Sequence, residues 1–83
     1  MILHIFSVYD TKIHSFGAPF FVNHEQSALR IMSNAVNDPT VEFFRHHADY
    51  MLFQMGEFNT ETAEFNLLVS PKNMGPLTQY KEQ

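Results

Sequence analysis

The chain has 83 residues, no cysteine, 45% hydrophobic residues and a formal net charge of −4 at pH 7. A chain of this length builds one hydrophobic core, which buries roughly 60 to 65% of the surface that the unfolded chain exposes. These figures exclude a second domain, disulfide bonds, thiolate metal sites and an intrinsically disordered chain.

The first predicted element is a strand over Ile2–Tyr9. Both sets of alternating positions are largely apolar, which is typical of a central strand that is covered on two sides. We expect an exposed, mobile loop over Lys12–Ala18, followed by a second extended segment around Phe20–Val22.

A helix is predicted next, with Asn23 as its N-cap and Gln26 placed three residues later, as in a capping box. Asp38-Pro39 ends this helix, because proline cannot continue the hydrogen-bond ladder. Apolar residues recur at helical spacing and predict one buried stripe: Ala28, Leu29, Met32, Ala35 and Val36.

The second half of the chain begins with Val41–Tyr50, which we interpret as a short turn or one-turn helix. Strands are predicted over Tyr50–Phe58 and Glu64–Val69, joined as a hairpin. The remainder has little periodicity and predicts a C-terminal tail, partly disordered, over residues 71–83. The expected fold is therefore one α+β domain over residues 1–70, with a small antiparallel sheet, one helix on one face and the order β-β-α-β-β.

Residues with catalytic or metal-binding chemistry do not form a recognisable constellation. The densest histidine cluster, His46 and His47 beside Asp49, has adjacent histidines that point to opposite sides in an extended chain. None of the serines lies in a nucleophile elbow, and the three glycines are too scattered for a phosphate loop. We therefore expect no enzymatic activity, no metal and no cofactor, with a role in binding instead.

Aromatic side chains offer one binding chemistry, because rings on an open sheet can stack single-stranded bases. The candidate rings are Tyr9, Phe20, Phe21, Tyr50 and Phe53. The alternative is that a chain with nine Phe and no Trp uses Phe to fill its core. The five cations are scattered, which disfavours tight non-specific nucleic-acid binding by one subunit. The residues that we select as a candidate nucleic-acid site are Tyr9, Lys12, Arg30, Arg45 and Tyr50.

Self-association is expected from the first strand, because a single helix covers only one of its two apolar faces. A core this small also supplies only about 3–5 kcal/mol of net stability, which a partner subunit can supplement. We predict a homodimer or a higher symmetric oligomer, with the uncovered sheet face or the edge of the first strand at the interface. Such pairing could also bring Arg30 and Arg45 of both copies together along one groove. Apolar runs are too short to span a membrane, and the missing export signal indicates a reducing cytoplasm.

Short segments of the sequence, in the right order over residues 5–70, resemble the small nonstructural protein of gokushovirus-type microviruses. The segments that carry the resemblance are Ile5–Asp10, Pro19–Val22, Ala28–Arg30, Asn34–Pro39, Asp49-Tyr50, Leu52-Phe53 and Gly56–Phe58. His46-His47-Ala48 departs from the His-Pro-Glu or similar run expected before Asp49-Tyr50, so the role of this loop stays open.

The resemblance implies a bacteriophage with a single-stranded DNA genome and expression in the cytoplasm of the bacterial host. By gene position and size, the family is compared with a microviral protein that helps switch replication toward single-stranded genomes for packaging. It implies a nonstructural accessory protein that assists replication or packaging through single-stranded DNA or protein contacts. The alternative is an interaction module that binds a phage or host replication protein without touching DNA.

Overall fold

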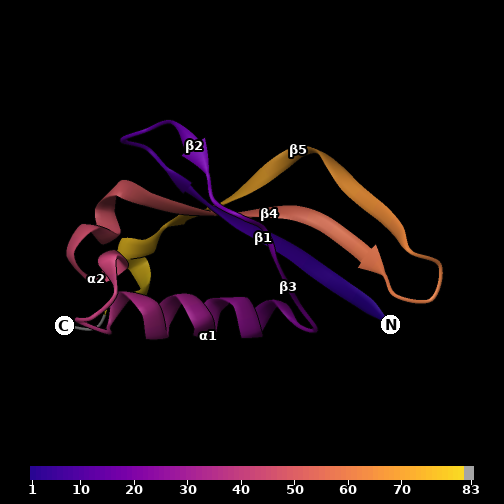
Figure 1. Cartoon of the computed structure of the whole chain (residues 1–83), viewed down its shortest axis with the longest axis horizontal. Coiled ribbons are helices and arrows are strands. Elements are labelled where there is room, and N and C mark those ends of the chain that lie inside the picture. Colours follow the sequence, from indigo (N-terminus) through magenta and orange to yellow (C-terminus); the bar gives the residue numbers. More distant parts are fainter. Residues whose placement is uncertain (82–83) are drawn as a thin grey trace.

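The computed structural model describes residues 1–81, which form an antiparallel sheet with α1 packed along one face (Figure 1). In chain order the elements are β1 (Ile2–Asp10), β2 (Ser15–Phe16), β3 (Phe20–Val22), α1 (Glu25–Val36), α2 (Glu42–His46), the 3-10 turn η1 (His47–Asp49), β4 (Tyr50–Asn59), β5 (Glu64–Pro76) and the 3-10 turn η2 (Leu77–Tyr80).

Strand β1 is the centre of the sheet and is paired along both edges. β4 runs antiparallel to it from Ile2↔Asn59 to Asp10↔Tyr50, and β5 pairs with the far edge of β4. On the other edge of β1, β3 pairs with its first half and β2 with its last two residues. The gap between these two short strands is closed because Ser7 Oγ donates to the Gly17 carbonyl at 2.7 Å and the Gly17 amide donates to the Val8 carbonyl at 2.8 Å.

The hydrophobic core lies between α1 and the sheet. Phe6 of β1 and Leu52 of β4 are fully buried there, against Ala28, Met32 and Val36 of the helix. The predicted helical stripe is confirmed at these three positions, and Leu29 packs against the same cluster. Each fully buried side chain of this size stabilises the fold by about 1.5–3 kcal/mol, so the α1–sheet contact is the main source of stability.

The start of α1 differs from the prediction. His24 is the N-cap residue, one position after Asn23, and its side chain makes no capping hydrogen bond. The Ser27 amide donates instead to the backbone carbonyl of His24 at 3.0 Å. The capping-box interpretation of Asn23 and Gln26 is therefore wrong: Asn23 lies between the end of β3 at Val22 and the N-cap His24, which makes Gln26 the second helical residue and not the third.

The sheet also contains more than the predicted order β-β-α-β-β. The antiparallel sheet with a helix on one face is confirmed. β2, however, forms inside the segment that we expected to be a loop, and α2 and η1 together occupy the segment expected to be a turn or one-turn helix. A two-residue strand carries no periodic signal of its own, so the pairing of Phe16 with Tyr9 depends on the tertiary contacts around Gly17.

The expected domain boundary at residue 70 falls inside β5, which continues to Pro76. Leu77 of η2 is fully buried in the core, and Asn37 Nδ2 donates to the Tyr80 carbonyl at 3.1 Å. Residues 71–81 therefore belong to the domain, which corrects the predicted tail. The sequence does not predict this ordered structure, because the alternation of apolar and polar residues that marks a strand is interrupted by Pro71, Gly75 and Pro76. Residues 82–83 of that tail lie outside the described residues.

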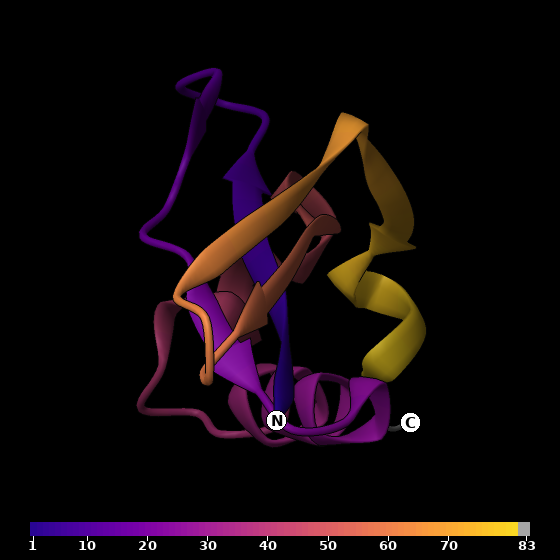
Figure 2. The same cartoon turned by 90° about the vertical axis from the view of Figure 1, so that its right-hand side faces the viewer.

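Strand β5 bends sharply in its middle, as Figures 1 and 2 show. The pairing with β4 passes from Gly56↔Leu67 directly to Gln54↔Lys72. Residues 68–71 therefore have no register partner on β4 and form a bulge. Gly56 permits the close approach before the bend, because a Cβ at this position would lie 2.4 Å from the Asn66 carbonyl oxygen. The bend turns β5 out of the plane of the other strands.

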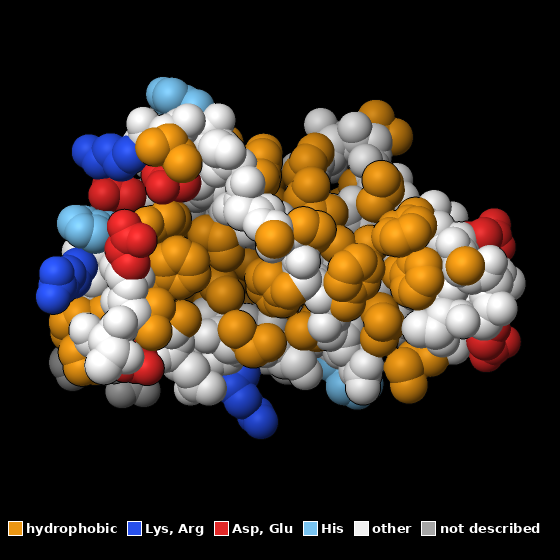
Figure 3. Space-filling model, in the orientation of Figure 1, with side chains coloured by type: hydrophobic (Ala, Val, Ile, Leu, Met, Phe, Trp, Pro, Cys, Tyr) orange, Lys and Arg blue, Asp and Glu red, His pale blue; other side chains and the backbone are white. Residues whose placement is uncertain are grey.

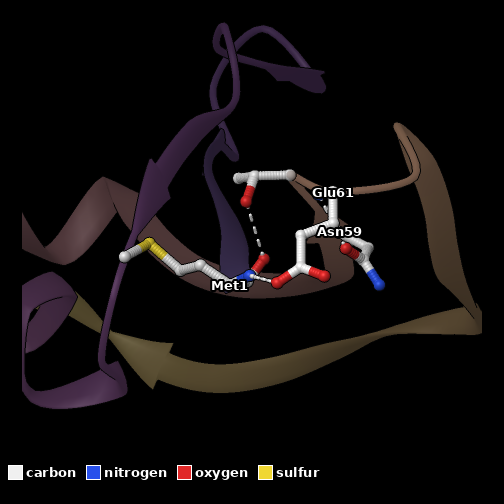
Figure 4. A network of polar contacts seen from close by, with 4 residues as sticks. Met1, Asn59 and Glu61 are labelled. Atoms are coloured by element: carbon white, nitrogen blue, oxygen red, sulfur yellow. Dashed lines mark hydrogen bonds and ion pairs between the residues drawn. The ribbon is translucent and has the colours of Figure 1, made fainter.

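The turn between β4 and β5 is fastened to the N-terminus of the chain (Figure 4). The Met1 ammonium lies 3.3 Å from Glu61 Oε1, and the Thr60 amide donates to the Met1 carbonyl at 3.0 Å. Asn59 Oδ1 accepts a hydrogen bond from the Glu61 amide at 2.9 Å within the turn. These contacts hold the far end of the hairpin against the start of β1.

The buried stripe of α1 is tested by two neighbouring residues of the helix, one buried against the sheet and the other exposed. Met32→Ala should lower the free energy of unfolding by about 2–5 kcal/mol, because Met32 is buried against the sheet. Ile31→Ala is the matched control: Ile31 is exposed, so its truncation should change stability by no more than about 0.5 kcal/mol. Urea denaturation of both variants measures the difference, and equal losses would show that the wrong side of α1 is placed inward.

The role of the C-terminal segment is tested by Leu77→Ala. Because Leu77 is fully buried beside α1, the substitution should also cost about 2–5 kcal/mol of unfolding free energy. Thermal denaturation followed by circular dichroism measures the loss. An unchanged melting curve would mean that η2 is a tail outside the folded core.

Candidate functional site

The face of the sheet opposite α1, here called the open face, is made of the second set of alternating side chains. Residues on this face are Leu3, Ile5, Ser7 and Tyr9 of β1, Phe16 of β2, Phe21 of β3, Met51, Phe53 and Phe58 of β4, and Phe65, Leu67 and Asn73 of β5. Ile5 and Ser7, in the middle of the face, are buried, whereas Phe16, Phe21, Phe65 and Leu67 are exposed. Residues with charged side chains are absent from this set.

One end of the open face carries the Tyr9 cluster, formed by Tyr9, Phe16 and Phe53. The ring centroids lie 4.7 Å apart for Tyr9–Phe16, 5.3 Å for Phe16–Phe53 and 6.0 Å for Tyr9–Phe53. The two contacts of Phe53 are edge-to-face, a favourable geometry for aromatic pairs. Phe16 remains 44% exposed, so part of this ring surface is open to a ligand.

The other end carries the Phe65 cluster, formed by Phe21, Phe58 and Phe65. Their centroids lie 4.6 Å apart for Phe58–Phe65, 6.0 Å for Phe21–Phe58 and 6.4 Å for Phe21–Phe65. The cluster joins β3 to the β4–β5 hairpin across the width of the sheet. The open face thus holds two separate ring clusters, one toward each end of β1.

The structure brings together only part of the site that the sequence predicts. Tyr9 and Lys12 lie toward the same end of β1, but with different neighbours: the Tyr9 hydroxyl lies 3.4 Å from His14 Nδ1, whereas Lys12 lines a hollow with Asp10 and Glu42. Tyr50 is buried on the helix side, with its ring 4.5 Å from that of Phe43. Arg30 lies on α1, across the sheet from Tyr9, and Arg45 lies in the last turn of α2.

Phe16 is the ring that sequence reasoning missed in this cluster. The sequence predicts a loop for its segment, whereas the candidate rings all lie in predicted strands. The only available signal was the aromatic residue directly before Gly17, and nothing local to it indicates pairing with Tyr9.

A shallow hollow of about 260 Å³ opens beside the Tyr9 cluster, under the turn after β1. Its walls include Phe16, Phe43 and Tyr50, but also the carboxylates Asp10 and Glu42. A second hollow of about 320 Å³ adjoins Asp10, Glu42 and Asp49, with Lys12 and His46 at its wall. This concentration of carboxylates disfavours phosphate groups inside either hollow.

The histidine pair diverges. His46 Nδ1 lies 3.8 Å from Asp49 Oδ2, whereas His47 Nδ1 lies 3.1 Å from the Thr78 hydroxyl of η2. In the described part of the chain, no three or more His, Asp or Glu side chains gather in a way that could hold a metal ion. The two histidines therefore contact different residues, and the hydrogen bond of His47 links η1 to η2.

The Tyr50 hydroxyl gives this end of the molecule a pH dependence. Burial raises the pKa of Tyr50 above its ordinary value, and Glu42, Asp10 and Asp49 raise it further. Because the folded pKa is the higher one, the neutral phenol contributes stability below the unfolded pKa of about 10. That contribution is lost as the pH rises through the folded pKa.

Tyr50→Phe should therefore flatten the fall in stability at alkaline pH while leaving the fall at acidic pH unchanged. Urea denaturation of the two proteins at a series of pH values from neutral to strongly alkaline measures this. Parallel alkaline slopes for wild type and variant would contradict the assigned direction of the Tyr50 shift.

Comparison with known proteins places the chain in a family. A family model described as phage ORF5 protein matches residues 3–80. The same comparisons found no matching curated protein and no matching solved structure. Among residues 1–81 there is no helix with the length and apolarity to cross a membrane. The family match confirms the resemblance to a phage protein and is consistent with a microviral origin. Since the match covers nearly the whole sequence, the chain belongs to the phage ORF5 protein family.

Proposed function

We propose that this phage protein is a non-enzymatic accessory factor that assists replication or packaging of a single-stranded DNA genome in the bacterial cytoplasm. Its proposed contact with the DNA is made by the Tyr9 cluster at the end of the open face. Membership of a phage protein family supports the biological setting, and the resemblance to microviruses supports the single-stranded genome.

The exposed ring of Phe16 is the observation that carries this proposal. It lies within contact distance of Tyr9 and Phe53, so the cluster presents aromatic surface that is already held in place. Nucleobases stack on such rings with little sequence preference, because every base has a flat π-face. Lys12, in the turn after β1, is the cation nearest to Tyr9 along the chain, and we expect it to reach the phosphate that follows a stacked base.

The distribution of charge sets the strength of this contact. The chain carries a net charge of −4, and Asp10 and Glu42 line the hollow next to the rings. Stacking therefore contributes more than phosphate neutralisation, and the expected affinity of one subunit is modest. The same charges favour a second candidate, an interaction module that binds a phage or host replication protein through the open face and leaves DNA untouched.

Fluorescence anisotropy with a labelled single-stranded oligonucleotide separates the two candidates. We expect binding at about 20 mM salt that weakens, but does not vanish, at about 150 mM, because the stacking part of the affinity is insensitive to salt. Absence of binding at the lower salt would remove the DNA contact and leave the protein-binding module.

Two substitutions locate the contact. Phe16→Ala should weaken binding by about 1–3 kcal/mol, the cost of removing one stacked ring. Lys12→Glu should weaken binding and reduce the salt dependence. The same charge reversal at Arg30, across the sheet on α1, gives the comparison: equal losses at Lys12 and Arg30 would show that affinity follows net charge and not the Tyr9 cluster.

A further inference from the structure

The other end of the molecule presents an apolar surface that the proposed DNA contact does not use. This surface, here called the β5 patch, consists of Phe21, Phe65, Leu67, Leu68 and Val69, all of them exposed. Phe65 is 58% exposed, Leu67 64%, and Val69 is fully exposed at the bulge of β5. Figure 3 shows hydrophobic side chains in a broad band across the middle of the molecule, with most charged side chains toward its two ends.

The area of the patch matches what a stable dimer needs. At about 150–200 Å² for each large apolar side chain, its exposed fractions amount to about 500 Å². A standard interface buries about 800 Å² on each partner, of which a little more than half is apolar, or about 450 Å².

Charges flank the patch in a self-complementary order. Along β5 the apolar stretch is bounded by Glu64 on one side and by Lys72 on the other. Neither residue takes part in an ion pair within residues 1–81. A two-fold axis near Leu68 would run two β5 strands antiparallel, so that each Glu64 meets the Lys72 of the other copy. A copy is thus the partner whose apolar area and flanking charges both fit.

Continuous pairing of two β5 edges is opposed by the bulge at residues 68–71 and by Pro71, which lacks a backbone donor. The patch side chains, by contrast, project from the strand and are available for packing. We propose that a second copy of this chain covers the β5 patch, giving a two-fold dimer held by side-chain packing and by Glu64–Lys72 pairs between the copies.

Light scattering coupled to size exclusion tests the dimer on the full chain. At about 10–100 µM protein we expect a mass of twice 9.7 kDa for the wild type. Val69→Asp should give the mass of one chain with unchanged circular dichroism, because a fully exposed side chain contributes nothing to the core. Ile31→Asp, at an exposed position on α1, should leave the dimer intact. A wild-type mass of one chain at these concentrations would overturn the proposal.

Charge exchange tests the two-fold arrangement separately. Glu64→Lys and Lys72→Glu should each weaken the homodimer about tenfold, because like charges then face one another twice. An equimolar mixture of the two variants should recover a dimer of near wild-type affinity, since every pair across the axis is again of opposite sign. Failure of the mixture to recover would reject this arrangement of the two copies.

The dimer goes beyond the proposed DNA contact, because it uses the Phe65 end of the open face and not the Tyr9 cluster. The experiments distinguish a failure of the dimer proposal from a failure of the DNA-contact proposal. A dimer that does not bind the oligonucleotide would remove the DNA contact alone, and a monomer that binds it would remove the dimer alone.

Discussion

Strand β1 has to bury both of its faces, and the described part of the chain offers α1 to cover only one of them. Phe6 satisfies this requirement on the helix side, where it meets the stripe of α1. On the open side, Ile5 is buried in the middle of the sheet, and rings gather toward both ends. The close approach of β5 at Gly56, where a side chain would collide with Asn66, lets the hairpin curl toward this second face. The helix on one face and the curled β4–β5 hairpin beside the other thus both help to bury β1.

Local periodicity was sufficient to predict the elements that bury one clear stripe. The alternation in β1 and the helical spacing of Ala28, Met32 and Val36 correctly predicted a sheet with a helix on one face. Leu77 escaped prediction because its burial depends on contact with α1, far away in sequence, and the surrounding prolines and glycine conceal it. The N-cap was predicted one residue too early, because Asn23 has the residue type of a cap but the helix begins after His24, which makes no side-chain capping bond.

The candidate site was predictable only in part, for a related reason. Tyr9 and Lys12 are near in sequence and lie toward the same end of β1, whereas Arg30 lies on α1 and the Tyr50 side chain is buried in the core on the helix side of the sheet. The pairing that places Phe16 beside Tyr9 rests on backbone contacts of Gly17. The resulting surface combines an uncharged face with charged ends, which suits contact by packing and stacking more than by phosphate neutralisation. Its two ring clusters give one small domain room for two different partners.

The central claim is that the open face is the working surface and that its two ring clusters contact different partners. Two-dimensional NMR of the aromatic ring signals tests it most directly. On dilution of the protein, the signals of Phe21 and Phe65 should shift, because a second copy leaves them. On addition of single-stranded oligonucleotide, those of Tyr9 and Phe16 should shift instead. Shifts that map to the outer side of α1 in both titrations, or no ring shifts in either, would contradict the account.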